Sequence, residues 1–209
     1  MGLYLKKRLD DSSFLGVWRI TESVEQLEKL VTPEQLVELN RYQNSKRKKE
    51  KLAARVLLNH LAGKQAKITY STNGKPELAN RPYNISISHS GDYVAIIVSY
   101  KSKVGIDIQY ISDKIYKVLP RFMHPEEYQN IHPYLADHSI HLHWCAKETL
   151  YKLHGKGNLN WTDQMRVTPF DVNEAGKMKG LIQTDSEFKE YELNYAAMDG
   201  NYIMVWAAN

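Results

Sequence analysis

The sequence predicts an α+β fold, built as a pseudo-twofold pair of similar α+β lobes. Apolar residues alternate or run continuously in some segments, as in strands, and recur with a helical period in others. Each half of the chain has a long helix with a basic side, then a glycine or turn region, then an apolar strand. We therefore expect an N-terminal lobe over residues 1–102 and a C-terminal lobe over residues 103–209.

The first half begins with two expected strands, at residues 3–5 and 14–20. Two helices should follow, because Ser23 with Gln26 and Thr32 with Gln35 have the spacing of a capping box. Pro33 directly after Thr32 strengthens the second start, since proline fits the first turn of a helix. The remaining elements of this half are a basic helix at about 45–61, a turn at 73–76, and strands at 84–88 and 93–100.

The second half should open with a strand at residues 104–109 and contain a long helix at 138–154. Shorter helices are expected at 113–122 and 125–131, and closing strands at about 166–170, 188–195 and 202–207.

Composition narrows the classes of function. The formal net charge of +4 is a mild basic bias, which suits an anionic ligand or an acidic protein partner and does not require nucleic acid. The single cysteine, Cys145, excludes an intramolecular disulfide, so a cytoplasmic setting is the default expectation. No apolar run approaches the roughly 18 residues of a membrane span, and the N-terminus lacks the order of a signal peptide.

Asp107 lies in the segment Val104-Gly105-Ile106-Asp107-Ile108-Gln109. If this is a strand, Gly105, Asp107 and Gln109 share one face, because alternate residues point the same way. Gly105 would let another backbone or a ligand come close, and Asp107 with Gln109 could supply oxygen ligands to Mg²⁺. An ordinary solvent-facing aspartate is the simpler interpretation of Asp107 taken alone.

The segment Trp144-Cys145-Ala146-Lys147-Glu148-Thr149-Leu150-Tyr151-Lys152 should lie on the long helix. Trp144, Glu148, Tyr151 and Lys152 then cluster on one face at spacings of three and four. A surface ion pair between Glu148 and Lys152, worth about 0.3–0.5 kcal/mol, is the simpler interpretation. Trp144 weakens it, because a large aromatic side chain marks a cleft or a packed surface.

Three further groups of polar side chains are candidate binding sites. Ser88-His89-Ser90-Gly91 at a strand end could bind a small anion or form a tight turn. Arg47 and Arg55, eight residues apart, should fall roughly on one side of the basic helix, where a solvated face is the alternative. The histidines and Cys145 show no zinc spacing.

Taken together, these segments resemble the 4′-phosphopantetheinyl transferases, specifically the surfactin-type two-lobed branch. The resemblance is strong over residues 45–160. It is carried by Gly105-Ile106-Asp107 and by Trp144, Lys147, Glu148 and Lys152 at their spacing. Supporting segments are Arg55-Val56-Leu57-Leu58, Gly74-Lys75-Pro76, Asn84-Ile85-Ser86 running into Ser88-His89-Ser90-Gly91, Arg121-Phe122 with Glu127-Tyr128, and Gly155-Lys156-Gly157.

The resemblance implies an enzyme that moves the phosphopantetheine arm of coenzyme A onto a serine of an acyl or peptidyl carrier protein and releases 3′,5′-ADP. It implies an N-terminal lobe that holds the nucleotide, an acidic carrier protein as partner, and a monomer. The implied site has metal ligands for Mg²⁺ (Asp107, Glu148 and Gln109), lysines at the pyrophosphate (Lys147 and Lys152), a base (Glu148 or Glu127), and coenzyme A contacts (Arg55, Lys75, Ser88 and His89, with Arg47 as a further phosphate contact).

One residue departs from the family pattern. The family has Glu two residues after the aspartate, where this chain has Gln109. Weaker Mg²⁺ binding is expected, since an amide carries no charge. Two alternatives follow: a coenzyme A-binding regulator without catalysis, and a metal-dependent nuclease. The nuclease is disfavoured because Leu150 stands where a lysine two residues after the glutamate would be expected.

Overall fold

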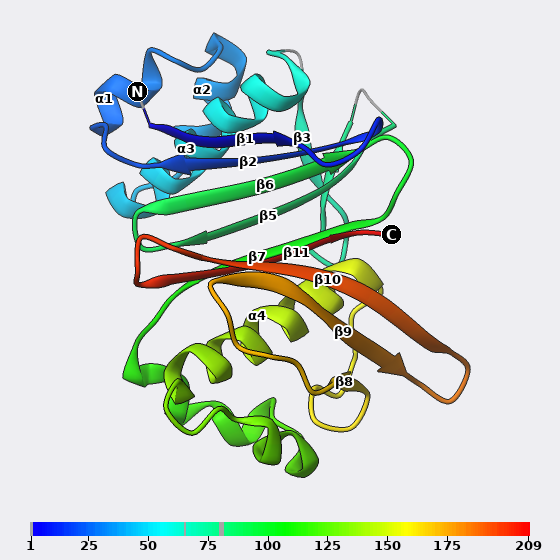
Figure 1. Cartoon of the computed structure of the whole chain (residues 1–209). Helices are drawn as coiled ribbons and strands as arrows, with labels where there is room; N and C mark the ends of the chain where they lie inside the picture. The colour runs from blue at the N-terminus through cyan, green and yellow to red at the C-terminus, as the bar shows by residue number, and fades with distance from the viewer. Residues whose placement is uncertain (1, 65, 80–81) are drawn as a thin grey trace. The chain divides into compact units, whose positions relative to one another are not determined.

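The computed structural model describes residues 2–64, 66–79 and 82–209 of the chain and confirms the α+β class (Figure 1). The chain divides into two compact units, Met1–Val104 and Gly105–Asn209. Each unit has its own sheet with helices against it. The functions expected for the two lobes stay predictions.

The first unit holds a six-stranded antiparallel sheet in the order β1-β2-β6-β5-β4-β3. The expected strands and turn are confirmed, and two short strands that flank the turn, β3 and β4, add to them. The bounds are β1 (Leu3–Arg8), β2 (Ser13–Arg19), β3 (Ile68–Tyr70), β4 (Pro76–Leu78), β5 (Asn84–Ser90) and β6 (Tyr93–Ser99).

Three helices cover one face of this sheet: α1 (Val24–Glu28), α2 (Pro33–Leu39) and α3 (Ser45–Ala62) (Figure 1). The two expected capping boxes are present at Ser23 and Thr32. Helix α3 packs closely on β2, because a Cβ added to Gly16 would lie 2.8 Å from a methyl carbon of Leu57. Apolar residues of α3 therefore form much of the core of this unit.

The second unit holds a five-stranded sheet in the order β7-β11-β10-β9-β8, with α4 (Ala136–His154) packed against it. The strand bounds are β7 (Val104–Tyr110), β8 (Met165–Val167), β9 (Ala175–Gln183), β10 (Phe188–Met198) and β11 (Tyr202–Ala208). Strand β9 was not expected from the sequence. It nevertheless alternates, with Met178, Gly180 and Ile182 directed towards the buried side.

The two expected short helices of this unit are instead 3₁₀ turns. They are η1 (Asp113–Lys117), η2 (Leu119–Arg121) and η3 (Pro125–Asn130). Pro120 and Pro125 each occupy a first turn and divide the segment, since proline cannot continue a preceding helix, so no continuous α-helix forms.

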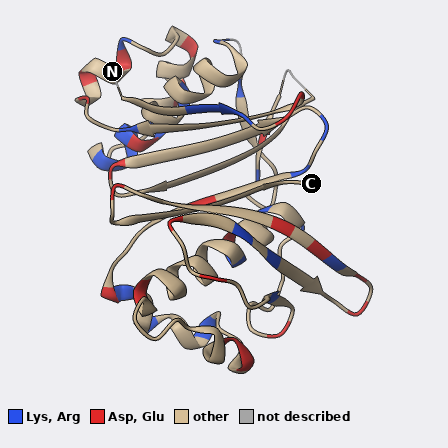
Figure 2. Cartoon of the chain, viewed as in Figure 1, with Lys and Arg blue, Asp and Glu red and all other residues tan. Residues whose placement is uncertain are grey.

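Charges of both signs line the hairpin of β9 and β10 (Figure 2). Lys177 pairs with Glu192 at 2.7 Å and Lys179 with Glu190 at 2.8 Å, all four side chains being exposed. This is a solvated cross-strand ladder of modest energetic value. Within the described ranges, no helix is both long and apolar enough to pass through a membrane.

Candidate active site

Strand β7 and helix α4 of the second unit touch through their backbones. A Cβ added to Gly105 would lie 2.5 Å from the carbonyl oxygen of Thr149 and 2.9 Å from Cγ of Leu153. Only glycine fits this approach, as its place in the strand indicated. The two segments singled out in the sequence therefore lie side by side.

Asp107 follows Gly105 on the same side of β7 and is only 5% exposed. The ammonium of Lys152 lies 2.7 Å from Oδ1 of Asp107 and donates a second hydrogen bond to the carbonyl of Ile106 at 2.8 Å. The simpler interpretation of Asp107 as a solvent-facing aspartate is therefore wrong. The ion-pair partner of Lys152 on α4 is thus Asp107 on β7. This contact replaces the expected surface ion pair between Lys152 and Glu148.

Glu148 lies one helical turn before Lys152. Burial raises the pKa of its carboxyl to about 7, with a further increase from the charge of Asp107 and an opposing decrease from Lys152. Two carboxylates and one ammonium thus share a small, partly buried space. Carboxyl groups with strongly shifted pKa values of this kind cluster at functional sites.

The donor set fits a divalent cation. Asp107 and Glu148 supply hard oxygen donors, and the partly exposed Gln109 can add an amide oxygen from the same side of β7. Throughout the described part of the chain, no three His, Cys, Asp or Glu side chains cluster to hold a metal. The repulsion that raises the pKa of Glu148 is one that a bound divalent cation would relieve.

Lys147 takes a different direction from Glu148, because neighbouring residues of a helix point about 100° apart. Its side chain is 0% exposed, and its ammonium donates to Glu127 at 2.6 Å, to the carbonyl of Phe122 at 2.6 Å and to that of Trp161 at 3.1 Å. Burial lowers the pKa of Lys147, and Glu127 opposes that shift. All three N–H donors are used within the protein.

Glu127 is equally enclosed, at 2% exposure. Besides Lys147, its carboxylate accepts hydrogen bonds from the backbone N–H groups of His124 and Val167, both at 2.7 Å. The roles expected from the resemblance, pyrophosphate contact for Lys147 and base for Glu127, are poorly matched by side chains so fully occupied. Their contacts suit an anchoring role within the protein. Nothing in their sequence spacing indicated the pair.

Aromatic rings cover the exposed side of α4. Trp144 lies 5.0 Å from Phe122 and 5.4 Å from Trp161, and Tyr151 lies 5.6 Å from Trp161, measured between ring centroids. The expectation that Trp144 marks a packed surface is confirmed. The role of Trp161 was not anticipated.

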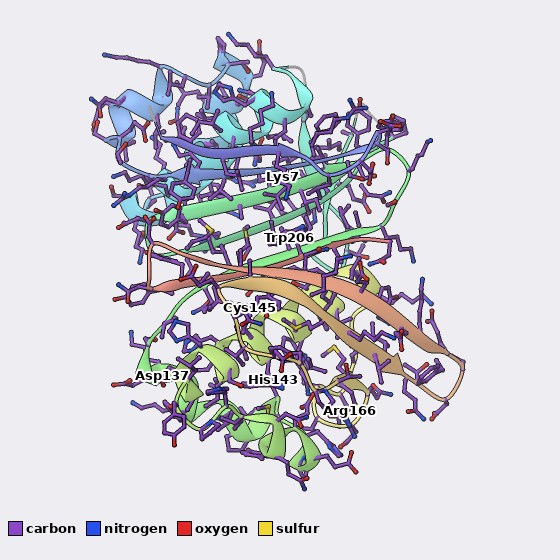
Figure 3. All side chains as sticks on the ribbon, viewed as in Figure 1. Lys7, Asp137, His143, Cys145, Arg166 and Trp206 are labelled. Atoms are coloured by element: carbon purple, nitrogen blue, oxygen red, sulfur yellow. The ribbon has the colours of Figure 1, made fainter. Side chains whose placement is uncertain are left out.

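The opposite side of α4 faces the sheet. Cys145 lies there (Figure 3), with Sγ 3.8 Å from the carbonyl of Ile203, and burial raises the pKa of its thiol. Thr149 donates to the carbonyl of Val205 at 3.1 Å. This side fixes the helix on the strands and leaves Glu148 and Lys152 on the flank beside β7.

The expected nucleotide contacts belong to the first unit. Nδ1 of His89 lies 3.5 Å from a carboxylate oxygen of Glu50, a neighbour that the sequence did not indicate. Ser88 is buried while His89 is exposed, since successive residues of β5 point to opposite faces. Lys75 follows the turn at Gly74, and burial together with the charge of Lys103 lowers its pKa.

The two arginines of α3 lie in different surroundings. Arg47 is exposed, with its guanidinium 5.6 Å from the ring centre of Tyr42. Arg55 is 1% exposed and pairs with Glu38 at 2.7 Å. They do not form a common basic face, which contradicts the expectation from their spacing of eight. The buried guanidinium of Arg55 is a poor match for its expected nucleotide contact.

The similarity to a known protein family lies in the second unit. Residues 103–206, about half of the chain, match the model of the 4′-phosphopantetheinyl transferase superfamily. Through this half the chain belongs to that superfamily. The match contains every residue of the β7–α4 site.

Three relatives with similar sequences carry related names. The Synechocystis sp. protein slr0495, provisionally named a 4′-phosphopantetheinyl transferase, is 31% identical over 143 residues, covering 61% of this chain and 58% of the relative. The rat L-aminoadipate-semialdehyde dehydrogenase-phosphopantetheinyl transferase is 26% identical over 206 residues, covering 85% and 66%. Escherichia coli 4′-phosphopantetheinyl transferase AcpT is 39% identical over 66 residues, covering 31% and 34%. The chain thus spans less than two thirds of the length of these relatives.

Proposed function

We propose that the protein transfers the 4′-phosphopantetheine arm of coenzyme A to a serine of an acyl or peptidyl carrier protein and releases 3′,5′-ADP. We further propose that it belongs to the surfactin-type two-lobed branch of the superfamily. The observation that carries the proposal is the contact between Lys152 and Asp107, at 2.7 Å, beside Glu148. These residues lie within the part of the chain that matches the superfamily.

The proposed reaction forms one bond and breaks one. The serine oxygen bonds to the phosphorus that carries the pantetheine arm, and the bond from this phosphorus to the bridging oxygen of the pyrophosphate breaks. The bonding electrons leave with 3′,5′-ADP, and the proton of the serine hydroxyl passes to a base. Negative charge grows on the phosphate oxygens and on the departing bridge, so nearby cations lower the barrier.

Glu148 is the proposed base. Its carboxylate lies beside Asp107 and Lys152, and an ionised carboxylate can accept the proton of an alcohol. Glu127 suits this role less, because its oxygens already accept three hydrogen bonds. Lys152, 24% exposed, is the ammonium proposed to stabilise charge on the phosphate oxygens.

Asp107, Glu148 and Gln109 are the residues that would hold Mg²⁺. When bound, the ion would neutralise the pyrophosphate and polarise its oxygens. The same residues without the ion keep Lys152 close to Asp107, so the ammonium is already in place for an anionic substrate.

The proposed contacts with the nucleotide are Lys75, Ser88 and His89, with Arg47 as a further exposed cation. Their chemistry, an ammonium, a hydroxyl and an imidazole, suits phosphate oxygens. An acidic carrier protein is the proposed partner, which the net charge of +4 supports by speeding the encounter. We also propose a monomer, because one chain carries both sets of residues, and a cytoplasmic setting, which the single cysteine favours.

Intact-mass analysis tests the transfer directly. Apo acyl and peptidyl carrier proteins are incubated with coenzyme A, Mg²⁺ and the protein, and each carrier should gain one phosphopantetheine. Glu148→Ala should abolish the gain, while the matched control Glu126→Ala, on an exposed turn, should leave it intact.

The same experiment separates the alternatives. Binding of coenzyme A with no mass gain across several carriers would overturn the transferase in favour of a coenzyme A-binding regulator. Cleavage of DNA or RNA that is lost in Glu148→Ala, with no stabilisation by coenzyme A, would identify the nuclease instead.

A further inference from the structure

A groove of about 510 Å³ lies in the first unit, between the segment that joins α1 to α2 and the last turns of α3. This volume is in the range of about 300–1,000 Å³ that binding sites occupy. Of the residues around it, Trp18 and Val56 are almost completely buried and offer no surface to a ligand. The accessible walls are cationic and aliphatic: Lys29, His60 and Lys64, with Leu30, Val31 and Pro33.

The charged side chains of the groove are cationic. Lys29 and Lys64 are exposed, and in the described part of the chain neither ammonium forms an ion pair. The described residues that line the groove include no aspartate or glutamate. The whole unit has the same sign, because residues 1–104 hold 18 Lys and Arg against 10 Asp and Glu, a formal charge of +8. An acidic partner is therefore attracted to the unit and then to the groove.

The carboxylates next to the groove in sequence have contacts of their own. Glu28 pairs with Lys48 at 2.6 Å. Glu34 hydrogen-bonds to Thr32 and to its own backbone N–H at the start of α2. Neither of them lines the groove. A carboxylate from outside would thus meet the two lysines without displacing an acid of this chain.

Aliphatic side chains form the rest of the accessible wall. Leu30, which follows α1, is 42% exposed, and Pro33 is exposed with Val31 half-buried beside it in sequence. An inorganic anion would leave these groups in water, whereas a leucine side chain would cover them. Single-stranded nucleic acid is bound largely by stacking on aromatic rings, and the indole of Trp18 is 0% exposed here. The wall therefore favours an acidic protein segment.

Contacts within the unit hold the groove in shape. The side-chain amides of Asn59 and Gln35 exchange two hydrogen bonds, at 3.1 and 3.0 Å, which join α3 to α2. The ring of His60 lies 5.6 Å from that of Trp18, and the carbonyl of His60 accepts a hydrogen bond from Lys6 at 2.8 Å. Walls that are already ordered reduce the entropy lost on binding.

The groove is separate from the groups proposed for the transfer reaction. Lys75, Ser88 and His89 do not line it. Asp107 and Glu148 belong to the second unit. Binding in the groove therefore requires neither coenzyme A nor the transfer reaction.

We propose that this groove binds an acidic segment of a partner protein in which a leucine or a similar side chain stands among carboxylates. The aliphatic side chain packs against Leu30, Val31 and Pro33. The carboxylates lie beside the ammonium groups of Lys29 and Lys64. Such a segment supplies both kinds of group within a few residues, which a small inorganic anion does not.

Fluorescence anisotropy of a short labelled peptide tests the proposal on the full chain. The probe has two leucines with aspartate and glutamate on both sides and is blocked at both ends. It should bind saturably, and added salt should weaken the binding. The same peptide with serines in place of the leucines should bind several-fold more weakly. Absence of saturable binding, or equal binding of the serine peptide, would overturn the proposal.

Charge-reversal variants locate the binding. Lys29→Glu with Lys64→Glu should weaken binding of the probe about tenfold or more, because two attractions become repulsions. The matched control is Lys7→Glu with Lys101→Glu, which changes two exposed lysines outside the groove and alters the net charge equally. It should weaken binding far less. Equal losses in both double variants would show that the charge of the whole unit, and not the groove, holds the peptide.

Leu30→Ser tests the aliphatic wall. It should weaken binding of the probe several-fold, while Val37→Ser, at a 75% exposed position of α2 outside the groove, should not. Thermal unfolding shows whether each variant is folded. Unchanged affinity in folded Leu30→Ser would contradict the proposed contact. Displacement of the probe by a short oligothymidylate at a lower concentration than by unlabelled peptide would overturn the proposal in favour of nucleic acid.

Discussion

The ammonium of Lys147 lies 2.6 Å from a carboxylate oxygen of Glu127, and neither side chain reaches solvent. Together they hold four backbone groups: the carbonyls of Phe122 and Trp161, and the N–H groups of His124 and Val167. The pair thus fastens the 3₁₀ segment and the loop before β8 to helix α4. Glu148 is the next residue along the helix.

Lys147→Met should destabilise the protein strongly, because it leaves the carboxylate of Glu127 buried without its cation. A loss of about 3–5 kcal/mol is expected in the free energy of unfolding, measured with urea. The double variant Lys147→Met with Glu127→Gln should recover a large part of this loss. If both residues act only by anchoring, the folded double variant should also retain transferase activity.

The matched control is Lys177→Met, which breaks an ion pair of similar length, 2.7 Å, on an exposed hairpin. Its unfolding should hardly change. A Lys147→Met protein as stable as this control would contradict the anchoring role. A stable double variant without activity would point to direct participation in catalysis instead.

Glu148→Gln should stabilise the metal-free protein at high pH. The folded-state pKa of about 7 lies above the ordinary value of 4.5, so the folded protein favours the protonated form. Stability is therefore lost as the pH rises from about 4.5 through 7, by up to about 3 kcal/mol. Glutamine resembles the protonated form and escapes this loss.

Urea unfolding in the presence of a chelator checks this at pH 8 and pH 5. The variant should exceed the wild type at pH 8, and the difference should shrink at pH 5. The control Glu126→Gln, an exposed carboxylate, should show no such trend. If Glu148→Gln is no more stable than wild type at pH 8, ionisation of Glu148 does not lower the free energy of unfolding, and the prediction is wrong.

The sequence was informative about the elements that follow simple periods. The capping residues Ser23 and Thr32 located two helix starts, and the apolar run 93–99 located the buried strand β6. Strand β9 escaped prediction because lysine, glycine and alanine dilute its alternation and have low strand propensity. Its register is set by its long pairing with β10 and by Leu150, which packs over Gly180.

Part of the candidate site could likewise be predicted from the sequence, and part could not. The approach of β7 to α4 was foreseeable from Gly105, since a glycine inside an apolar strand marks close contact. The pairing of Lys147 with Glu127 was not, because twenty residues without a shared period separate them. Burial of Arg55 was likewise hidden, because its partner Glu38 lies on another helix.

His143 should make the protein sensitive to mild acid. Its side chain is buried on α4 (Figure 3), donates from Nδ1 to the carbonyl of Ser139 at 2.8 Å and packs against Phe170. Burial lowers its pKa below the ordinary 6.5. The unfolded chain therefore takes up a proton first at this position, and the contribution of His143 to stability falls as the pH drops below about 6.5, by up to about 1.4 kcal/mol per pH unit.

Unfolding measured from pH 7.5 to pH 5 checks this. The stability of wild type should fall relative to that of His143→Gln as the pH drops, because Glu148 and His141 contribute equally to both proteins. The control His60→Gln, at an exposed position of α3, should follow the wild-type curve. Parallel curves for His143→Gln and wild type would contradict the assignment.

Gln109→Glu should lower the Mg²⁺ concentration needed for half-maximal transfer. Gln109 is partly exposed at the end of the row that contains Asp107, so its replacement adds a negative charge next to the proposed metal ligands. Attraction between two unit charges about 4 Å apart is worth about 1 kcal/mol in water and more where the solvent is partly excluded. This corresponds to a several-fold change in affinity for Mg²⁺. Activity is titrated against Mg²⁺ in both proteins. The neutral control Gln109→Asn should not lower the requirement, and an unchanged half-saturating concentration in Gln109→Glu would exclude this residue from the metal site.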